Sequence, residues 1–187
     1  MVNGLIKDWV ARIQQRDRVW YMTIQRLRGK HQLVDRWISW LGRFGPLLFF
    51  LEMGGIFVIL GIQERSNAVK VLYVLLVAIA AALSTKFIID PLAARIARVR
   101  PFVKESVVPL VAKDPQDPSF PSNHAGGAFA LGIFLSIAFP HLLFFSLGLA
   151  ILISFSRVYI GLHYFTDVLV GGMIGTLVSL LYWKIWL

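Results

Sequence analysis

The chain has 187 residues, of which 57% are hydrophobic and 16% are charged. An ordinary globular domain has about 45–50% apolar and about 25% charged residues. Because the excess is concentrated in long runs, the composition predicts an integral membrane protein and excludes a soluble enzyme, a disordered tail and a secreted disulfide scaffold. The chain has no cysteine, which excludes a disulfide, a thiolate metal site and a cysteine nucleophile. The net charge of +9 favours anionic lipid headgroups or an anionic substrate over nucleic acid.

Residues 1–44 are basic and amphipathic. They contain nine of the 19 Lys and Arg, interleaved with Trp and Tyr. This section is too charged to cross a bilayer, and it lacks the apolar core and cleavage site of a signal peptide. We predict helices that lie in the plane of the headgroups, with a soluble pair of surface helices as the alternative.

Five hydrophobic runs follow this section. They are Pro46–Ile62, Val69–Ile89, Ala125–Phe139, Leu142–Phe155 and Val168–Trp186. Their lengths and the lack of strand alternation predict an all-α integral membrane protein, a helical bundle of about five to six transmembrane helices. All six Trp lie in the first forty or last five residues, as an interfacial belt would place them. We expect one membrane domain over residues 1–187.

Residues 90–123 are predicted to form a long polar loop between two spans. They hold six of the eight prolines and five Lys or Arg. A loop of this length is usually functional or disordered, and its apolar section argues against disorder. Two spans separate it from residues 157–167, so both segments are expected on the same side of the membrane. We therefore interpret residues 90–123 as an active-site loop.

The motif Pro-Ser-Asn-His at residues 121–124 opens the third hydrophobic run. Ser122 is a plausible N-cap, and the free backbone N–H groups of the first helical turn would form an anion site. His124 lies beside this site. Taken alone, the motif fits an ordinary helix cap with an interfacial histidine equally well.

A second motif runs from Ser156 to Asp167. His163 and Asp167 are four residues apart, which places them on one helix face. The carboxylate can accept a hydrogen bond from one ring nitrogen, fix the tautomer and leave the other nitrogen as a nucleophile. Arg157 adds a fork of donors suited to phosphate. A purely structural His–Asp pair is the alternative.

Arg100, followed by a proline, completes the set. Two arginines, two histidines and a helix N-terminus indicate phosphoryl transfer without a metal or cofactor, because carboxylates are too few for a two-metal site. No glycine-rich nucleotide loop precedes a helix, which excludes a kinase or an ATPase.

The three motifs, Arg-Pro, Pro-Ser-x-His and Ser-Arg-x5-His-x3-Asp, resemble in this order the type 2 phosphatidic acid phosphatase superfamily. The resemblance covers Lys86 to about Gly172. It implies a helical bundle with the site at one membrane face, His163 as a nucleophile that forms a phosphohistidine, Asp167 as its orienting residue, and His124 as the acid that protonates the leaving oxygen. The ligands that it implies for the phosphoryl oxygens are Arg100, Ser122, Asn123 and Arg157.

The sequence departs from the family pattern at two positions. Asn123 stands where glycine is usual, and asparagine also tolerates a left-handed turn. Ala93 stands where the family has a phosphate-binding lysine. Arg95, Arg98 or no residue replaces that lysine, and these alternatives stay open here.

A candidate partner for Glu52, which lies inside the first hydrophobic run, is Lys86.

Residues 100–132 further resemble the bacitracin-resistance branch, the undecaprenyl-pyrophosphate phosphatases. This resemblance implies hydrolysis of undecaprenyl diphosphate to undecaprenyl phosphate and phosphate. The alternative is a lipid monophosphatase acting on phosphatidylglycerophosphate, phosphatidic acid or lipid A. A transporter is disfavoured because the polar motifs gather at one interface and not at the midplane. The expected partners are the membrane and a lipid phosphate or diphosphate, with no nucleic acid.

The orientation of the site in the cell membrane is a separate question. Fifteen Lys and Arg fall on the predicted side of the site and three on the other. The positive-inside rule would then place the site in the cytoplasm. The family resemblance implies the outer face, and we expect the outer face because phosphate binding, and not only insertion, sets the positions of the arginines at the site.

Overall fold

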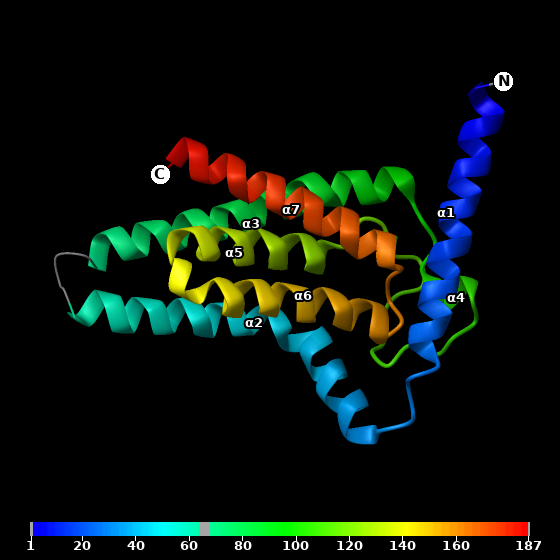
Figure 1. The fold of residues 1–187 in the computed structure, drawn as a ribbon, viewed down its shortest axis with the longest axis horizontal. Helices are drawn as coiled ribbons and strands as arrows, with labels where there is room; N and C mark the ends of the chain where they lie inside the picture. Colours follow the sequence, from blue (N-terminus) through cyan, green and yellow to red (C-terminus); the bar gives the residue numbers. More distant parts are fainter. Residues whose placement is uncertain (1, 64–67, 187) are drawn as a thin grey trace.

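Five long helices form the body of the molecule. The computed structural model describes residues 2–63 and 68–186, and all the regular structure in those ranges is helical. The five helices are α2 (Gln32–Gln63), α3 (Ala68–Ile96), α5 (Asn123–Ala138), α6 (Leu143–Tyr159) and α7 (Phe165–Trp186). They run along the long axis of the molecule, and α1 (Val2–Gln25) crosses the bundle at one end (Figure 1). The prediction of an all-α membrane bundle is confirmed.

Helix α5 is the centre of this bundle. It packs against α3, α6 and α7, and most of its side chains are buried. Within the described ranges, four helical segments are long and apolar enough to cross a membrane, namely α2, α3, α6 together with the short 3-10 helix η1 (Pro140–Leu142), and α7. With 16 residues, α5 is shorter, and it is also apolar. Its neighbours therefore shield it on several sides, while they present large apolar side chains outward.

The predicted boundary at residue 44 does not coincide with a helix end. Helix α2 begins at Gln32 and continues through the first hydrophobic run, so the section 1–44 is divided between α1 and the first part of α2. Pro46 lies inside α2. A proline removes one backbone hydrogen bond and bends a helix without ending it, and α2 is visibly bent along its length (Figure 1).

The predicted loop at 90–123 is also shorter than expected. Helix α3 continues through Pro91 to Ile96, and Lys86 forms an ion pair with Asp90 across one turn. The remaining connection contains α4 (Pro101–Lys104) and is fixed by backbone hydrogen bonds. The N–H of Ser119 donates to Arg98 O at 2.8 Å, and that of Leu110 donates to Ile160 O at 3.0 Å.

Glycine in α7 allows close contact with the beginning of α5. A Cβ atom added to Gly171 would lie 2.4 Å from Ser122 O, which no real side chain tolerates. Because this side chain is missing, the Ser122 N–H reaches the backbone oxygen of Asp167 at 2.9 Å. The packing of α5 on α7 thus joins two of the sequence motifs directly.

Candidate active site

A polar cavity of about 510 Å³ lies where α3, α5 and α6 meet the 97–122 connection. Its lining residues are Lys86, Asp90, Ala93, Ala94, Arg100, Lys113, Asp117, Pro118, Pro121, Asn123, His124, Arg157 and His163. All three sequence motifs contribute to this lining. The two predicted segments therefore lie on one side of the bundle, as their spacing along the chain indicated.

His163 is held as a neutral imidazole whose Nε2 lies beside Arg100. Its Nδ1 lies 2.7 Å from Ser119 O, and because a carbonyl oxygen only accepts, Nδ1 carries the proton. Nε2 is then unprotonated and lies 3.3 Å from Nη1 of Arg100. Burial lowers the pKa of His163 to about 4; Asp167 opposes this shift, while Arg157 and Arg100 reinforce it. At neutral pH Nε2 is therefore unprotonated, which is the state that a nucleophilic histidine requires.

Asp167 does not accept the hydrogen bond that the sequence predicted. Its Oδ2 lies 3.6 Å from His163 Nδ1, beyond hydrogen-bond distance. Oδ2 instead accepts from the Tyr164 N–H at 2.8 Å, and Oδ1 pairs with Arg98. The tautomer of His163 is fixed by Ser119 O, a backbone atom that no sequence pattern marks. The Asp167 charge opposes the lowering of the His163 pKa, and its hydrogen bond from the Tyr164 N–H holds the turn next to His163.

Arg100 and Arg157 bring two guanidinium groups to the cavity, and both residues are only 5% exposed. Arg100 donates to the backbone oxygens of Asp117 and Leu162, each at 3.0 Å. Arg157 donates to Gly42 O through Nη1. Among the described residues, no acceptor meets its Nε. Backbone carbonyls satisfy donors without cancelling the charge, so the two arginines form a cationic site that suits phosphate.

The start of α5 lies at the same site, where Asn123 and His124 line the cavity and the buried Ser122 does not. Ser122 is the N-cap, and its hydroxyl accepts a long hydrogen bond of 3.5 Å from the Ala125 N–H, in agreement with the predicted cap. Asn123 is the first helical residue and donates to Asp90. It is helical and does not use the left-handed conformation considered for it; among the described residues, the non-glycine residues with positive φ are Ala97 and Ser106.

The position of the missing lysine forms part of the cavity wall, because Ala93 lines it. Neither predicted substitute is among the lining residues. Arg95 is exposed, and Arg98 is bound to carboxylates outside the cavity. The lysine from α3 that lines the cavity is Lys86, paired with Asp90.

Glu52 has a different partner from the one predicted. Its carboxylate accepts a hydrogen bond from Ser146, whereas Lys86 pairs with Asp90 one turn away on its own helix. The proposed pair between Glu52 and Lys86 is therefore wrong. The spacing of four residues between Lys86 and Asp90 was the signal in the sequence for the correct pair.

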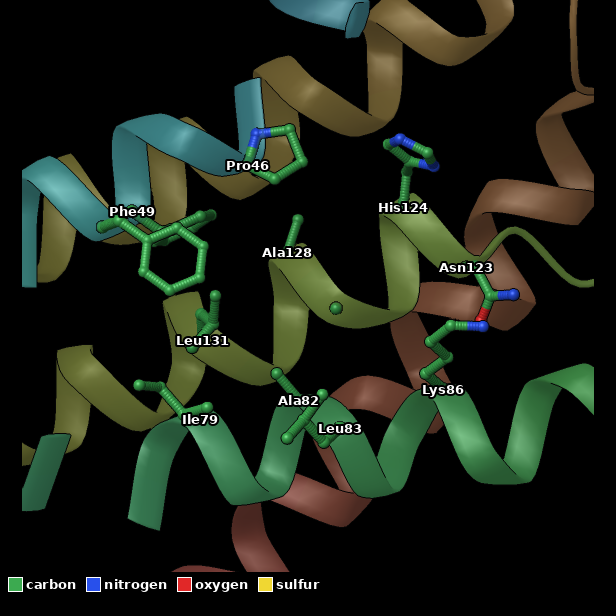
Figure 2. A pocket seen from close by; sticks show the side chains of 12 residues that line it. Pro46, Phe49, Ile79, Ala82, Leu83, Lys86, Asn123, His124, Ala128 and Leu131 are labelled. Carbon is green, nitrogen blue, oxygen red and sulfur yellow. The ribbon is translucent and has the colours of Figure 1, made fainter. Parts of the chain in front are cut away.

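An apolar groove of about 290 Å³ adjoins the polar cavity. It is lined by Pro46, Phe49, Phe50, Ile79, Ala82, Leu83, Lys86, Asn123, His124, Gly127, Ala128 and Leu131. Figure 2 shows Lys86, Asn123 and His124 at one end of this groove and Phe49, Leu131 and Ile79 toward the other. The three polar residues also line the polar cavity. A molecule with an anionic head and an apolar tail fits this arrangement.

Comparisons with known proteins identify the family of this chain. Residues 69–187 match the PAP2 superfamily. The chain is 36% identical over 87 residues to an undecaprenyl-diphosphatase of Sulfolobus acidocaldarius, and 33% identical over 90 residues to the undecaprenyl-diphosphatase BcrC of Bacillus subtilis. Each match covers 46% of this chain, and they cover 42% and 44% of those proteins, so the chain spans less than half the length of the curated relatives it matches.

A solved structure extends the similarity over most of the chain. The transmembrane PAP2-type phosphatidylglycerolphosphate phosphatase of Bacillus subtilis superposes with a TM-score of 0.66 at 27% sequence identity. The superposition covers 92% of this chain and 85% of that one. The resemblance inferred from the motifs is confirmed, and the chain belongs to the PAP2 superfamily.

Proposed function

We propose that the protein is a membrane lipid phosphatase that hydrolyses undecaprenyl diphosphate to undecaprenyl phosphate and phosphate. The observation that carries this proposal is the junction of the two cavities at Lys86, Asn123 and His124. The polar cavity offers two buried arginines and a neutral histidine to a phosphoryl group. The apolar groove offers a hydrocarbon surface to a lipid chain that enters from the bilayer.

In the first proposed step, Nε2 of His163 attacks the terminal phosphorus. The bond between this phosphorus and the bridging oxygen breaks, and the lipid phosphate leaves with the bond's electrons. Arg100, Arg157 and the donors at the start of α5, including Ser122 and Asn123, bind the phosphoryl oxygens as charge develops on them. The ring becomes cationic when it is phosphorylated, and Ser119 O keeps the Nδ1 proton in place.

In the second proposed step, water hydrolyses the phosphohistidine. His124 removes a proton from the water as the oxygen attacks phosphorus, and the bond to Nε2 breaks. Phosphate is released and His163 returns to its neutral form. A lipid phosphate is a good leaving group because its second pKa is about 6. His124 is therefore needed mainly in this second step when the substrate is a diphosphate.

The proposed reaction uses cationic side chains and a helix N-terminus where other phosphatases use metal ions. Arg100 and Arg157 supply two fixed positive charges, and Lys86 and Lys113 line the same cavity. We accordingly propose that turnover needs no metal.

A lipid monophosphatase is the second candidate. Its support is the similarity of this chain to the phosphatidylglycerolphosphate phosphatase of Bacillus subtilis. The diphosphate is preferred because the two curated relatives are undecaprenyl-diphosphatases and because Lys86, at the junction of the cavities, can meet a second phosphate next to the lipid.

The test is phosphate release in detergent with EDTA present, from undecaprenyl diphosphate, phosphatidylglycerophosphate and phosphatidic acid. The proposal expects the highest kcat/KM for the diphosphate and a loss of turnover in His163→Ala. His141→Ala, which changes an exposed histidine at the other end of α5, is the matched control and should retain activity. Turnover that stops with EDTA and returns with Mg²⁺ would contradict the metal-independent mechanism.

We further propose that the active site faces outward from the cell membrane. Val108 lies in the site's connection and is 82% exposed, whereas His141 is exposed at the opposite end of α5. In intact cells, an impermeant thiol reagent should label Val108→Cys and not His141→Cys. The reverse labelling would place the site in the cytoplasm.

A further inference from the structure

Helix α1 reaches into the neighbourhood of the catalytic histidine through one buried carboxylate. Asp17 lies on α1 and is only 2% exposed. Its Oδ1 accepts from the Thr166 N–H at 3.0 Å, and its Oδ2 accepts from the Thr166 hydroxyl and from Nη2 of Arg98 at 2.8 Å. Thr166 directly precedes Asp167, so this carboxylate binds the first turn of α7 next to the site.

Arg98 joins Asp17 to Asp167. Its Nη2 donates to Asp17 and its Nη1 donates to Asp167 Oδ1 and to the Thr166 hydroxyl. The guanidinium also lies over the Tyr164 ring, 4.3 Å from the ring centre. Its position is thus determined by three elements: α1, the 163–164 turn and α7.

We propose that Asp17 is a positioning residue for phosphoryl transfer, acting through Arg98 and Asp167 on His163. This role rests on the function proposed above. The chain of contacts runs from Asp17 to Arg98, from Arg98 to Asp167 Oδ1, and from Asp167 Oδ2 to the Tyr164 N–H beside His163. Asp17 itself does not contact the reacting atoms.

Two carboxylates hold the Arg98 guanidinium from two sides. Asp17 binds Nη2 and Asp167 binds Nη1, so Asp17 fixes Arg98, and Arg98 fixes the Asp167 carboxylate whose Oδ2 accepts from the Tyr164 N–H. Phosphorylation at Nε2 makes the ring cationic, and the Asp167 carboxylate beside it stabilises that form in a buried site. Without Asp17, Arg98 and with it Asp167 would lose this fixed position.

Asp17 is not needed merely to anchor α1, because α1 and the turn after it have other attachments to the same region. Tyr21 donates to Gly161 O at 3.3 Å and Gln25 donates to Val158 O at 2.9 Å, while Arg28, in the turn after α1, donates to Val108 O at 2.6 Å. None of these contacts involves the Asp17 carboxylate. We therefore expect the effect of the replacement to be local to Arg98 and Asp167.

The experiment is a double-mutant cycle with Asp17→Asn, Asp167→Asn and the double variant, measured on the best lipid phosphate. Asp17→Asn should lower kcat about tenfold or more with KM changed less than about threefold, as expected for a group that acts on the transition state. Because Asp17 acts through Asp167, the double variant should be no slower than Asp167→Asn by more than about threefold. Asp8→Asn, the same change at an exposed position of α1, should match wild type.

Losses that multiply in the double variant would contradict the role, since they mean that Asp17 acts independently of Asp167. So would a kcat for Asp17→Asn equal to that of Asp8→Asn. Thermal unfolding is followed in parallel, and Asp17→Ser, a smaller uncharged side chain, serves as the second variant if Asp17→Asn does not fold. A wild-type protein that turns over no lipid phosphate would contradict the proposed function, and with it this role.

Discussion

Replacement of Lys86 tests which part of a lipid diphosphate meets which part of the site. Lys86 lines both the polar cavity and the apolar groove, whereas Arg100 and Arg157 line only the polar cavity. If the terminal phosphate binds the two arginines, the phosphate next to the lipid lies near the Lys86 ammonium. A lipid monophosphate has no such group. Lys86→Met should therefore impair turnover of the diphosphate more than turnover of a monophosphate.

The expected magnitude follows from charge and exposure. Two unit charges about 4 Å apart interact by about 4 kcal/mol at an effective dielectric constant of about 20. The Lys86 side chain is 59% exposed and already pairs with Asp90, so solvent screening and the existing pair reduce the gain. We expect about 1–2 kcal/mol, which is a roughly five- to thirtyfold loss of kcat/KM for the diphosphate. For the monophosphate the loss should stay below about threefold.

Two variants make this comparison specific. In Lys86→Met, Asp90 keeps only its hydrogen bond from Asn123 and would repel any anionic substrate. The double variant Lys86→Met/Asp90→Asn removes that repulsion and should still discriminate between the substrates. Lys113→Met removes a cation that lines the polar cavity but not the groove, and should affect both substrates alike. Equal losses for both lipids in the Lys86 variants would refute the proposed location of the second phosphate.

Three further outcomes are expected. With undecaprenyl diphosphate, His124→Ala should accumulate an acid-labile, base-stable phosphoenzyme, detectable with labelled substrate, whereas His163→Ala should form none. Burial lowers the pKa of His163 to about 4, and its charged or titratable neighbours are Asp167, Arg157, Arg100 and His124. The contribution of His163 to folding stability should therefore be present above about pH 6.5 and decrease as the pH falls toward 4. Thermal unfolding as a function of pH measures this decrease. Gly171→Ala, whose Cβ would meet Ser122 O at 2.4 Å, should cost about 1–3 kcal/mol of stability and lower activity, while Gly148→Ala, which meets no atom within 4 Å, should do neither.

The bundle and the meeting of its motifs were predictable because they depend on local patterns. Hydrophobic runs identify the membrane helices, and the two spans between residues 123 and 157 bring both ends to one side. The helix boundaries at residues 32 and 96 were not predictable in this way. Pro46 and Pro91 resemble helix breakers in the sequence, yet both lie inside helices, because packing against neighbouring helices compensates for one missing hydrogen bond.

The partner of His163 illustrates a second limit. Asp167 is the obvious partner from its spacing of four residues, and its carboxylate lies 3.6 Å from the ring. The closer acceptor is the backbone oxygen of Ser119, at 2.7 Å, in a connection without regular structure. Every residue has such an oxygen, so only the path of the chain determines which one meets the imidazole.

The arginines show why charge in a sequence does not by itself identify a phosphate ligand. Arg98 and Arg100 are two residues apart, and both were candidates for the phosphate site. Arg98 binds two carboxylates and so has its charge cancelled. Arg100 binds two backbone oxygens, which satisfy its donors and leave its charge for an incoming anion. The deciding carboxylate, Asp17, lies 81 residues from Arg98 along the chain, on a helix that the sequence indicated only as a surface element. The partners that the fold supplies therefore decide whether an arginine is structural or binds substrate. Asp17→Asn should remove one of the two ion pairs of Arg98 and leave the backbone hydrogen bonds of Arg100 in place.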